Sequence, residues 1–172
     1  MPQPWITRDC FIVVMGVSGA GKSAISGRLA KALQCGWIEG DTLHSAENKE
    51  RIRHGIPLTD ALRWPWLAAI CDAAKARNER PLVIACSALK RSYRDFIRAR
   101  LAPVRFLFLD GPADLIAARM RARKGHFATV ELLQSQLAEL EPPTPDENAL
   151  KVDIALSPDE IVQQARDAIS SS

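Results

Sequence analysis

Residues 16–23 read GVSGAGKS and fit the pattern GxxxxGK[ST] at every fixed position, which constrains the fold more than any other feature of the chain. Six apolar residues, 10–15, precede this motif. Ile25, Leu29 and Leu33 follow it at four-residue spacing, which places them on one face of a helix. A buried strand, a glycine-rich loop and a helix in this order predict a phosphate-binding loop, whose backbone N–H groups surround a phosphate.

The same loop predicts a site for ATP and Mg²⁺. Lys22 is expected to reach the β- and γ-phosphates, and the hydroxyl of Ser23 is expected to hold the metal ion. Guanine-recognition motifs of the Asn-Lys-x-Asp type are absent from the sequence. The predicted nucleotide-binding residues are all eight of the loop, Gly16, Val17, Ser18, Gly19, Ala20, Gly21, Lys22 and Ser23.

Short apolar runs alternate with segments of helical period along the rest of the chain. Residues 36–39, 82–86, 104–109 and 150–154 predict four more strands. Five strands separated by helices indicate a parallel sheet covered on both faces, an α/β/α sandwich formed by a single domain over residues 1–172.

Two helix starts are expected from proline positions. Pro65 fits the first turn of a helix that buries Leu67 and Ile70, because its missing N–H costs nothing there. Residues 157–160 (Ser-Pro-Asp-Glu) form a capping box that starts the last helix.

Charge and cysteine content argue against several classes of protein. The 23 Lys and Arg residues exceed the 20 Asp and Glu residues by three and are spread out, which favours a mildly basic soluble protein over a nucleic-acid-binding one. A small anionic substrate would suit the same charge. No apolar run approaches the ~20 residues of a membrane span, and residues 1–9 lack the apolar stretch of a signal peptide. We therefore expect a cytoplasmic protein without a membrane partner. The four cysteines form no CxxC pair and are expected to be buried free thiols: Cys10, Cys35, Cys71 and Cys86.

Asp41 follows the second predicted strand, and the carboxyl ends of parallel strands face the ligand crevice. We therefore expect Asp41 near the γ-phosphate, where it accepts an alcohol proton or contacts Mg²⁺ through water. The alternative is that Asp41 caps the helix expected over residues 45–54. Asp110 ends the fourth strand and is expected to be a turn residue instead of the metal-site carboxylate of an ATPase.

Residues 119–126 are basic and are predicted to form part of a small helical lid over residues 120–140. Arg119 and Arg123 are four residues apart and share a helix face, from which they would neutralise charge on the transferred phosphoryl group. The alternative is a solvated basic helix end, which the helix dipole favours.

Six motifs are spread over nearly the whole chain. They are MGVSGAGKS (15–23), GDTLH with Asn48 (40–48), GIPLTD with Arg63, Pro65, Trp66 and Leu67 (55–67), CSALK with YRD (86–95), ARKGHF with Gln136 (122–136) and LEP (140–142). Together they resemble the gluconokinase family, a branch of the shikimate-kinase-like group. The chain departs from the family pattern at Ser45, Ile52 and Leu62, where the family often has Pro, Met and an acidic residue.

This resemblance implies a P-loop kinase fold with the strand order 2-3-1-4-5, a homodimer, and transfer of the ATP γ-phosphoryl group to the 6-hydroxyl of D-gluconate. It implies that Lys22, Asp41 and Arg123 are catalytic, with Arg119 near the nucleotide. The substrate's carboxylate requires Arg, Lys or His, and its hydroxyls require mixed donors and acceptors. The candidate substrate-binding residues are Asp41, His44, Arg51, Arg63, Lys90, Arg94, His126 and Gln136. Arg51 and Arg94 are equally well explained as solvated helix charges. Trp64 and Trp66 are expected to be packing residues, with the alternative that one of them faces the sugar chain.

Other functions remain open from the sequence. The same scaffold serves kinases of shikimate, of other sugar acids and of nucleotides. A non-catalytic ATP-binding switch would bind ATP without turnover. A nucleic-acid-associated ATPase is disfavoured by the scattered charge.

Overall fold

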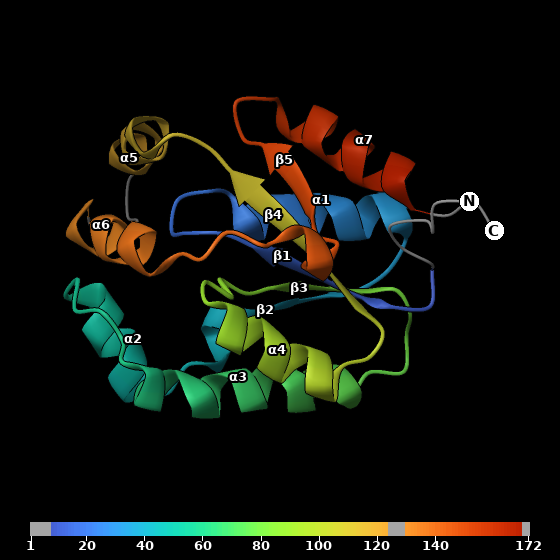
Figure 1. Ribbon diagram of the computed structural model, residues 1–172, viewed down its shortest axis with the longest axis horizontal. Helices are drawn as coiled ribbons and strands as arrows, with labels where there is room; N and C mark the ends of the chain where they lie inside the picture. Colours follow the sequence, from blue (N-terminus) through green and yellow to red (C-terminus); the bar gives the residue numbers. More distant parts are fainter. Residues whose placement is uncertain (1–7, 124–129, 170–172) are drawn as a thin grey trace.

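The central strand of the sheet is β1 (Phe11–Met15), all five of whose residues are buried. Figure 1 shows the computed structural model, which describes residues 8–123 and 130–169. Strand β1 pairs in parallel with β3 (Leu82–Ala85) on one side and β4 (Val104–Asp110) on the other. Strands β2 (Trp37–Glu39) and β5 (Leu150–Asp153) complete the order β2-β3-β1-β4-β5. The expected parallel sheet and its strand order are therefore confirmed.

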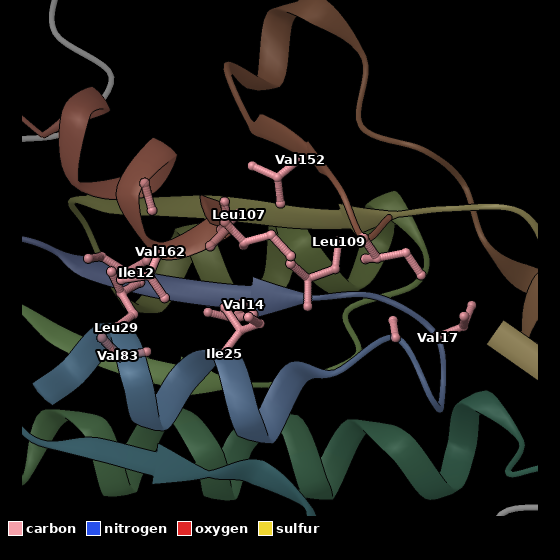
Figure 2. Close-up of a cluster of buried hydrophobic side chains, with 14 of the residues drawn as sticks. Ile12, Val14, Val17, Ile25, Leu29, Val83, Leu107, Leu109, Val152 and Val162 are labelled. Carbon is pink, nitrogen blue, oxygen red and sulfur yellow. The ribbon is translucent and has the colours of Figure 1, made fainter. Parts of the chain in front are cut away.

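Helices cover both faces of this sheet, and the alternation along β1 shows why its sequence is continuously apolar. Ile12 and Val14 pack with residues of α1 (Lys22–Leu33) and α7 (Pro158–Ala168), as Figure 2 shows. Phe11, Val13 and Met15 point to the opposite face, where α3 (Asp60–Lys75) and α4 (Arg91–Arg100) cover them. A strand buried on both faces has no solvent-facing positions for polar residues.

The remaining elements gather at the end of the sheet toward which the strands point (Figure 1). They are the short 3₁₀ turn η1 (Gly40–Leu43) and the helices α2 (Ala46–Arg53), α5 (Ala113–Ala122) and α6 (Val130–Glu139). A second 3₁₀ turn, η2 (Pro145–Glu147), precedes β5. Within residues 8–123 and 130–169, no helix has the length and apolar character required to cross a membrane.

The predicted start of the helix around Pro65 is wrong. Helix α3 begins at Asp60, after the N-cap Thr59, whose hydroxyl accepts a hydrogen bond from the Leu62 N–H. Pro65 therefore lies inside the helix, and the cap one turn earlier determines where the helix begins. The capping box predicted for the last helix is confirmed, since Ser157 accepts from the Glu160 N–H and Pro158 is the first helical residue.

The four cysteines are free, as expected. Cys10, Cys71 and Cys86 are buried, and Cys35 is half-buried. Burial raises the pKa of the Cys86 thiol to about 12, so that it stays protonated beside the phosphate-binding loop.

Candidate active site

The loop between β1 and α1 has the backbone conformation that a phosphate cradle requires. Gly21 precedes the first residue of α1 with φ +101°, in the left-handed region that favours glycine. Gly19 has φ +82°, and a Cβ atom there would lie 2.5 Å from Cγ of Met120 on α5. The loop is therefore closed against α5 at a position where only glycine fits.

Lys22 is the cation of this loop. Its Nζ donates a 3.0 Å hydrogen bond to the carbonyl oxygen of Val17, which folds the side chain back over the loop. Burial lowers the pKa of Lys22, although Asp41, Cys86 and Glu39 act in the opposite direction. A partly desolvated ammonium gains more from an arriving phosphate than a fully hydrated one does.

Glu39 is a site residue that sequence reasoning missed. The Ser23 hydroxyl donates to its carboxylate, and the same carboxylate accepts from the Asp41 N–H at 3.3 Å. A hydroxyl and a carboxylate at a phosphate-binding loop fit Mg²⁺, which prefers oxygen ligands and keeps several of its waters. The available signal was an acidic residue at the last position of a strand, two residues before Asp41.

A cavity of about 440 Å³ opens next to this loop. Six of the predicted site residues line it, namely Ser18, Lys22, Asp41, His44, Arg63 and Gln136. Eight further residues complete the lining, namely Thr42, Lys49, Ile52, Arg53, Leu58, Trp66, Ser87 and Leu132. The lining therefore combines apolar side chains with several donors and cations, as a polar anionic substrate requires.

Asp41 lies in η1, is exposed, and lines the cavity together with Lys22. The cap of α2 is Ser45, whose hydroxyl accepts from the Asn48 N–H at 3.1 Å. The alternative role of Asp41 as the helix cap is therefore excluded by the structure.

His44 and Trp66 form the inner wall beside Asp41. Their rings stack with centroids 4.2 Å apart, and the indole Nε1 of Trp66 donates to the carbonyl of Gly40 at 2.8 Å. Burial lowers the pKa of His44 to about 4, with Arg63 and Lys49 acting in the same direction and Asp41 against it. Trp66 is thus a packing residue, as expected, that also faces the cavity.

Arg63 belongs to a polar network that joins three helices. Its Nη1 donates to the Tyr93 hydroxyl at 3.0 Å and to the Glu139 carboxylate on α6. Tyr93 donates in turn to Asp60, which also accepts from Lys90 at 3.0 Å. The network holds the guanidinium of Arg63 at the cavity wall although this residue is buried.

Gln136 reaches the phosphate-binding loop from α6. Its Oε1 accepts a 2.7 Å hydrogen bond from the backbone N–H of Ser18. This contact connects residues 118 positions apart and closes the cavity between α6 and the loop.

Comparison with known proteins gives a consistent family. A family model described as an AAA domain matches residues 11–143. The thermosensitive gluconokinase of Escherichia coli (strain K12) is 42% identical over 161 residues, which are 91% of this chain and 86% of that protein. The chain belongs to the gluconokinase family. A gluconokinase structure from Sinorhizobium meliloti 1021 is 48% identical with a TM-score of 0.85, covering 94% of this chain and 92% of that one. A shikimate kinase structure from Bacteroides thetaiotaomicron, 17% identical with a TM-score of 0.67 and covering 92% of this chain and 97% of that one, shows the shared fold.

In this gluconokinase-family chain, the expectation that Arg94 binds substrate is corrected. Arg94 is fully buried, and all five of its N–H groups are used. Two pair with the Glu147 carboxylate, at 2.7 and 3.0 Å, and the others donate to the carbonyl oxygens of Ala88, Leu89 and Glu141. Arg94 therefore fastens the 141–147 segment to the start of α4.

Two other predicted substrate residues do not line the cavity of this gluconokinase-family protein. Arg51 lies on α2 and pairs with Glu47 at 3.8 Å, and Lys90 is held by Asp60. Helix α2 faces the cavity with Lys49, Ile52 and Arg53 instead. The side chain of Leu62, where the gluconokinase family often has an acidic residue, also lies outside the lining.

The predicted lid residues are only partly described. Arg119 and Arg123 are exposed, at the end of α5 and just after it, and neither lines the cavity. Helix α5 packs on the phosphate-binding loop through Ile116 and Met120, which places Arg119 on an element adjacent to that loop. His126 lies outside the described residues.

Proposed function

We propose that this chain is a gluconokinase, an ATP-dependent carbohydrate kinase that transfers the γ-phosphoryl group of ATP to the 6-hydroxyl of D-gluconate. The products are 6-phospho-D-gluconate and ADP. The observation that carries the proposal is that Lys22 of the phosphate-binding loop and Asp41 at the end of β2 line one cavity of about 440 Å³. Membership of the gluconokinase family supports the choice of acceptor.

Asp41 is proposed to orient the acceptor hydroxyl and to take its proton. Phosphoryl transfer proceeds through a loose transition state, so that positioning and charge neutralisation contribute more than proton removal. Lys22 supplies a positive charge to the phosphates from within the loop. Arg123, and Arg119 near the nucleotide, are proposed to add charge from the end of α5.

Ser23 and Glu39 are proposed to hold Mg²⁺, with Asp41 contacting it through water. Mg²⁺ supplies neutralisation of phosphate charge, and the nucleotide and water would complete its coordination. The support for this assignment is the hydrogen bond between Ser23 and Glu39 beside the loop.

The carboxylate of gluconate is assigned to three of the cations that line the cavity, Lys49, Arg53 and Arg63. His44 and Gln136 supply further groups for the hydroxyls. His126 stays a proposed substrate residue on its motif position alone. A homodimer and a cytoplasmic location are also proposed, on the resemblance to the family, and light scattering of the purified protein would test the dimer.

The test is ADP production with Mg-ATP across gluconate, other sugar acids, shikimate and nucleoside monophosphates. We expect a response to gluconate that exceeds all others. A stronger response to another acceptor would refute the substrate, and ATP binding without turnover on any acceptor would indicate a switch. Asp41→Asn should keep ATP binding and lose turnover, and near-normal activity of this variant would remove Asp41 from its role.

A further inference from the structure

The side-chain amide of Asn48 is oriented by its neighbour on α3, although its Oδ1 is buried there without a hydrogen-bond partner among the described residues. Asn48 is 4% exposed, on the first turn of α2, and its Nδ2 lies 3.2 Å from the backbone carbonyl oxygen of Leu62. A carbonyl oxygen only accepts hydrogen bonds, so the amide group that faces it is the NH₂. The main chain of α3 therefore determines which way the Asn48 amide points.

This orientation determines the proton position on His44. The same Nδ2 of Asn48 lies 3.3 Å from Nδ1 of His44. Because the NH₂ group donates, Nδ1 must accept, and the single proton of a neutral imidazole is then on Nε2. Stacking on Trp66, with the ring planes 15° apart, fixes the plane of the imidazole.

We propose that Asn48 is a positioning residue that fixes His44 as the Nε2–H tautomer, and that His44 thereby donates a hydrogen bond to a substrate oxygen as a neutral group. The identity of that oxygen, a hydroxyl or carboxylate oxygen of a polyhydroxy acid, rests on the proposed function. Asp41 and His44 are three residues apart around η1 and line the same cavity. The donor therefore serves the part of the substrate that lies near the proposed base.

The charges around the imidazole agree with a neutral ring. Lys49 on α2 and Arg63 on α3 disfavour its protonation, and Asp41 on η1 favours it. Burial outweighs the carboxylate and keeps the pKa of His44 at about 4. A neutral buried donor selects for an oxygen at one place, since a substrate lacking that oxygen leaves the N–H without a partner.

The tautomer is measured directly by long-range ¹H–¹⁵N correlation spectra of the ligand-free protein at neutral pH. The chain has three histidines, His44, His54 and His126, and His44→Gln assigns the signal. We expect a protonated Nε2 and an unprotonated Nδ1 for His44. Asn48→Leu is of similar size and removes the donor to Nδ1, so it should raise the fraction of His44 that carries the proton on Nδ1. A wild-type His44 with the proton on Nδ1 would refute the proposal, whatever the enzyme's activity.

The donor role is tested by a matched pair of variants. The side-chain nitrogen of Gln reaches the position of Nε2, whereas that of Asn reaches only the position of Nδ1. His44→Gln should keep kcat/KM for gluconate within about tenfold of wild type, and His44→Asn should lose about 100-fold. KM for ATP should not change in either variant, and thermal unfolding checks that both are folded. Equal losses in the two variants would show that His44 does not donate to the substrate.

The two measurements separate the inference from the proposed function. If gluconate is not phosphorylated, the function fails while the spectra still report the tautomer. The same pair of variants is then assayed with the acceptor that does respond.

Discussion

The indole Nε1 of Trp66 donates a 2.8 Å hydrogen bond to the carbonyl oxygen of Gly40, the residue immediately before Asp41. On its other side, Gly40 is so close to β3 that a Cβ atom would collide with the carbonyl oxygen of Ala85. The turn that carries Asp41 is thus held between an indole and a strand.

Trp66→Phe should therefore lower kcat with gluconate while leaving KM for ATP unchanged. The variant keeps an aromatic ring against His44 but removes the indole donor from the buried Gly40 carbonyl, which costs about 0.5–1.5 kcal/mol of unfolding free energy. Steady-state kinetics and thermal unfolding measure the two effects. Trp64→Phe is the matched control, because Trp64 packs on Tyr93 and Phe96 and lies outside the cavity lining. Equal kinetic losses in both variants would show that the bond to Gly40 does not position Asp41.

Glu39→Gln should weaken the binding of Mg²⁺ and so raise the Mg²⁺ concentration that activity requires. The amide keeps the shape of the side chain but removes the charge that faces the Ser23 hydroxyl. We expect the Mg²⁺ concentration for half-maximal ADP production to rise about tenfold at fixed ATP, a change of about 1.4 kcal/mol. Glu47→Gln, on the exposed side of α2, is the control and should leave this concentration unchanged. An unchanged Mg²⁺ requirement in Glu39→Gln would assign the metal to other groups.

Gly19→Ala and Gly27→Ala should change the free energy of unfolding in opposite directions. Alanine at position 19 would need φ +82° and would push its Cβ into Met120, so ATP binding and stability should both fall. Gly27 lies inside α1, where a Cβ would make an ordinary 3.6 Å contact with the Trp37 ring. There, alanine should raise the free energy of unfolding by up to about 1 kcal/mol. Calorimetry of thermal unfolding and of ATP binding measures both properties in the two variants. Unchanged ATP binding in Gly19→Ala would contradict the packing described for the loop.

Arg94→Met should lower the free energy of unfolding without changing substrate recognition. The substitution leaves the buried Glu147 carboxylate with Arg98 as its remaining charged partner and should cost about 3–5 kcal/mol. At a temperature where the variant is folded, KM for gluconate should equal that of wild type. Arg51→Ala on the surface of α2 should change neither property. A large rise of KM for gluconate in folded Arg94→Met would restore the role that sequence alone suggested.

Stability should decrease in acid because of Glu147. Burial would raise the pKa of this carboxyl, but hydrogen bonds from Arg94 and Arg98 outweigh it and hold the pKa at about 2, below the ordinary value of 4.5. The stabilisation is therefore complete above pH 4.5 and is lost as the pH falls toward 2, by roughly 3 kcal/mol in all. Chemical denaturation at a series of pH values should show this slope in wild type. The slope of unfolding free energy against pH should be smaller in Glu147→Gln. A slope identical to that of wild type would assign the acid sensitivity to other carboxyl groups.

The sequence was sufficient where the signal is local. The phosphate-binding loop, the buried strands and the Ser157 capping box each occupy a few consecutive residues whose pattern has one reading. Asp41 was found because its position after a strand fixes its place at the sheet edge.

The incorrect prediction for Arg94 and the overlooked Glu39 involve contacts that the local sequence does not specify. An arginine side chain suits a substrate site and a buried ion pair equally well, so the residue type does not distinguish the two roles. The observed partner of Arg94 is Glu147, which is 53 residues away in the sequence. Glu39 lacked a distinguishing neighbour, since its contact with Ser23 depends on how β2 lies against the start of α1. The predicted start of α3 rests on Pro65 alone, whereas the hydroxyl cap of Thr59 determines the boundary.

The bond between Gln136 and the Ser18 amide has a thermodynamic consequence. The Ser18 N–H can make a good hydrogen bond to only one acceptor. A ligand oxygen that accepts from this N–H therefore displaces the Gln136 side chain, and α6 loses this hydrogen bond to the loop. By linkage, a change that strengthens the hydrogen bond of Gln136 to the loop must weaken the binding of any ligand that needs this amide. Binding of such a ligand must in turn weaken this connection between α6 and the loop.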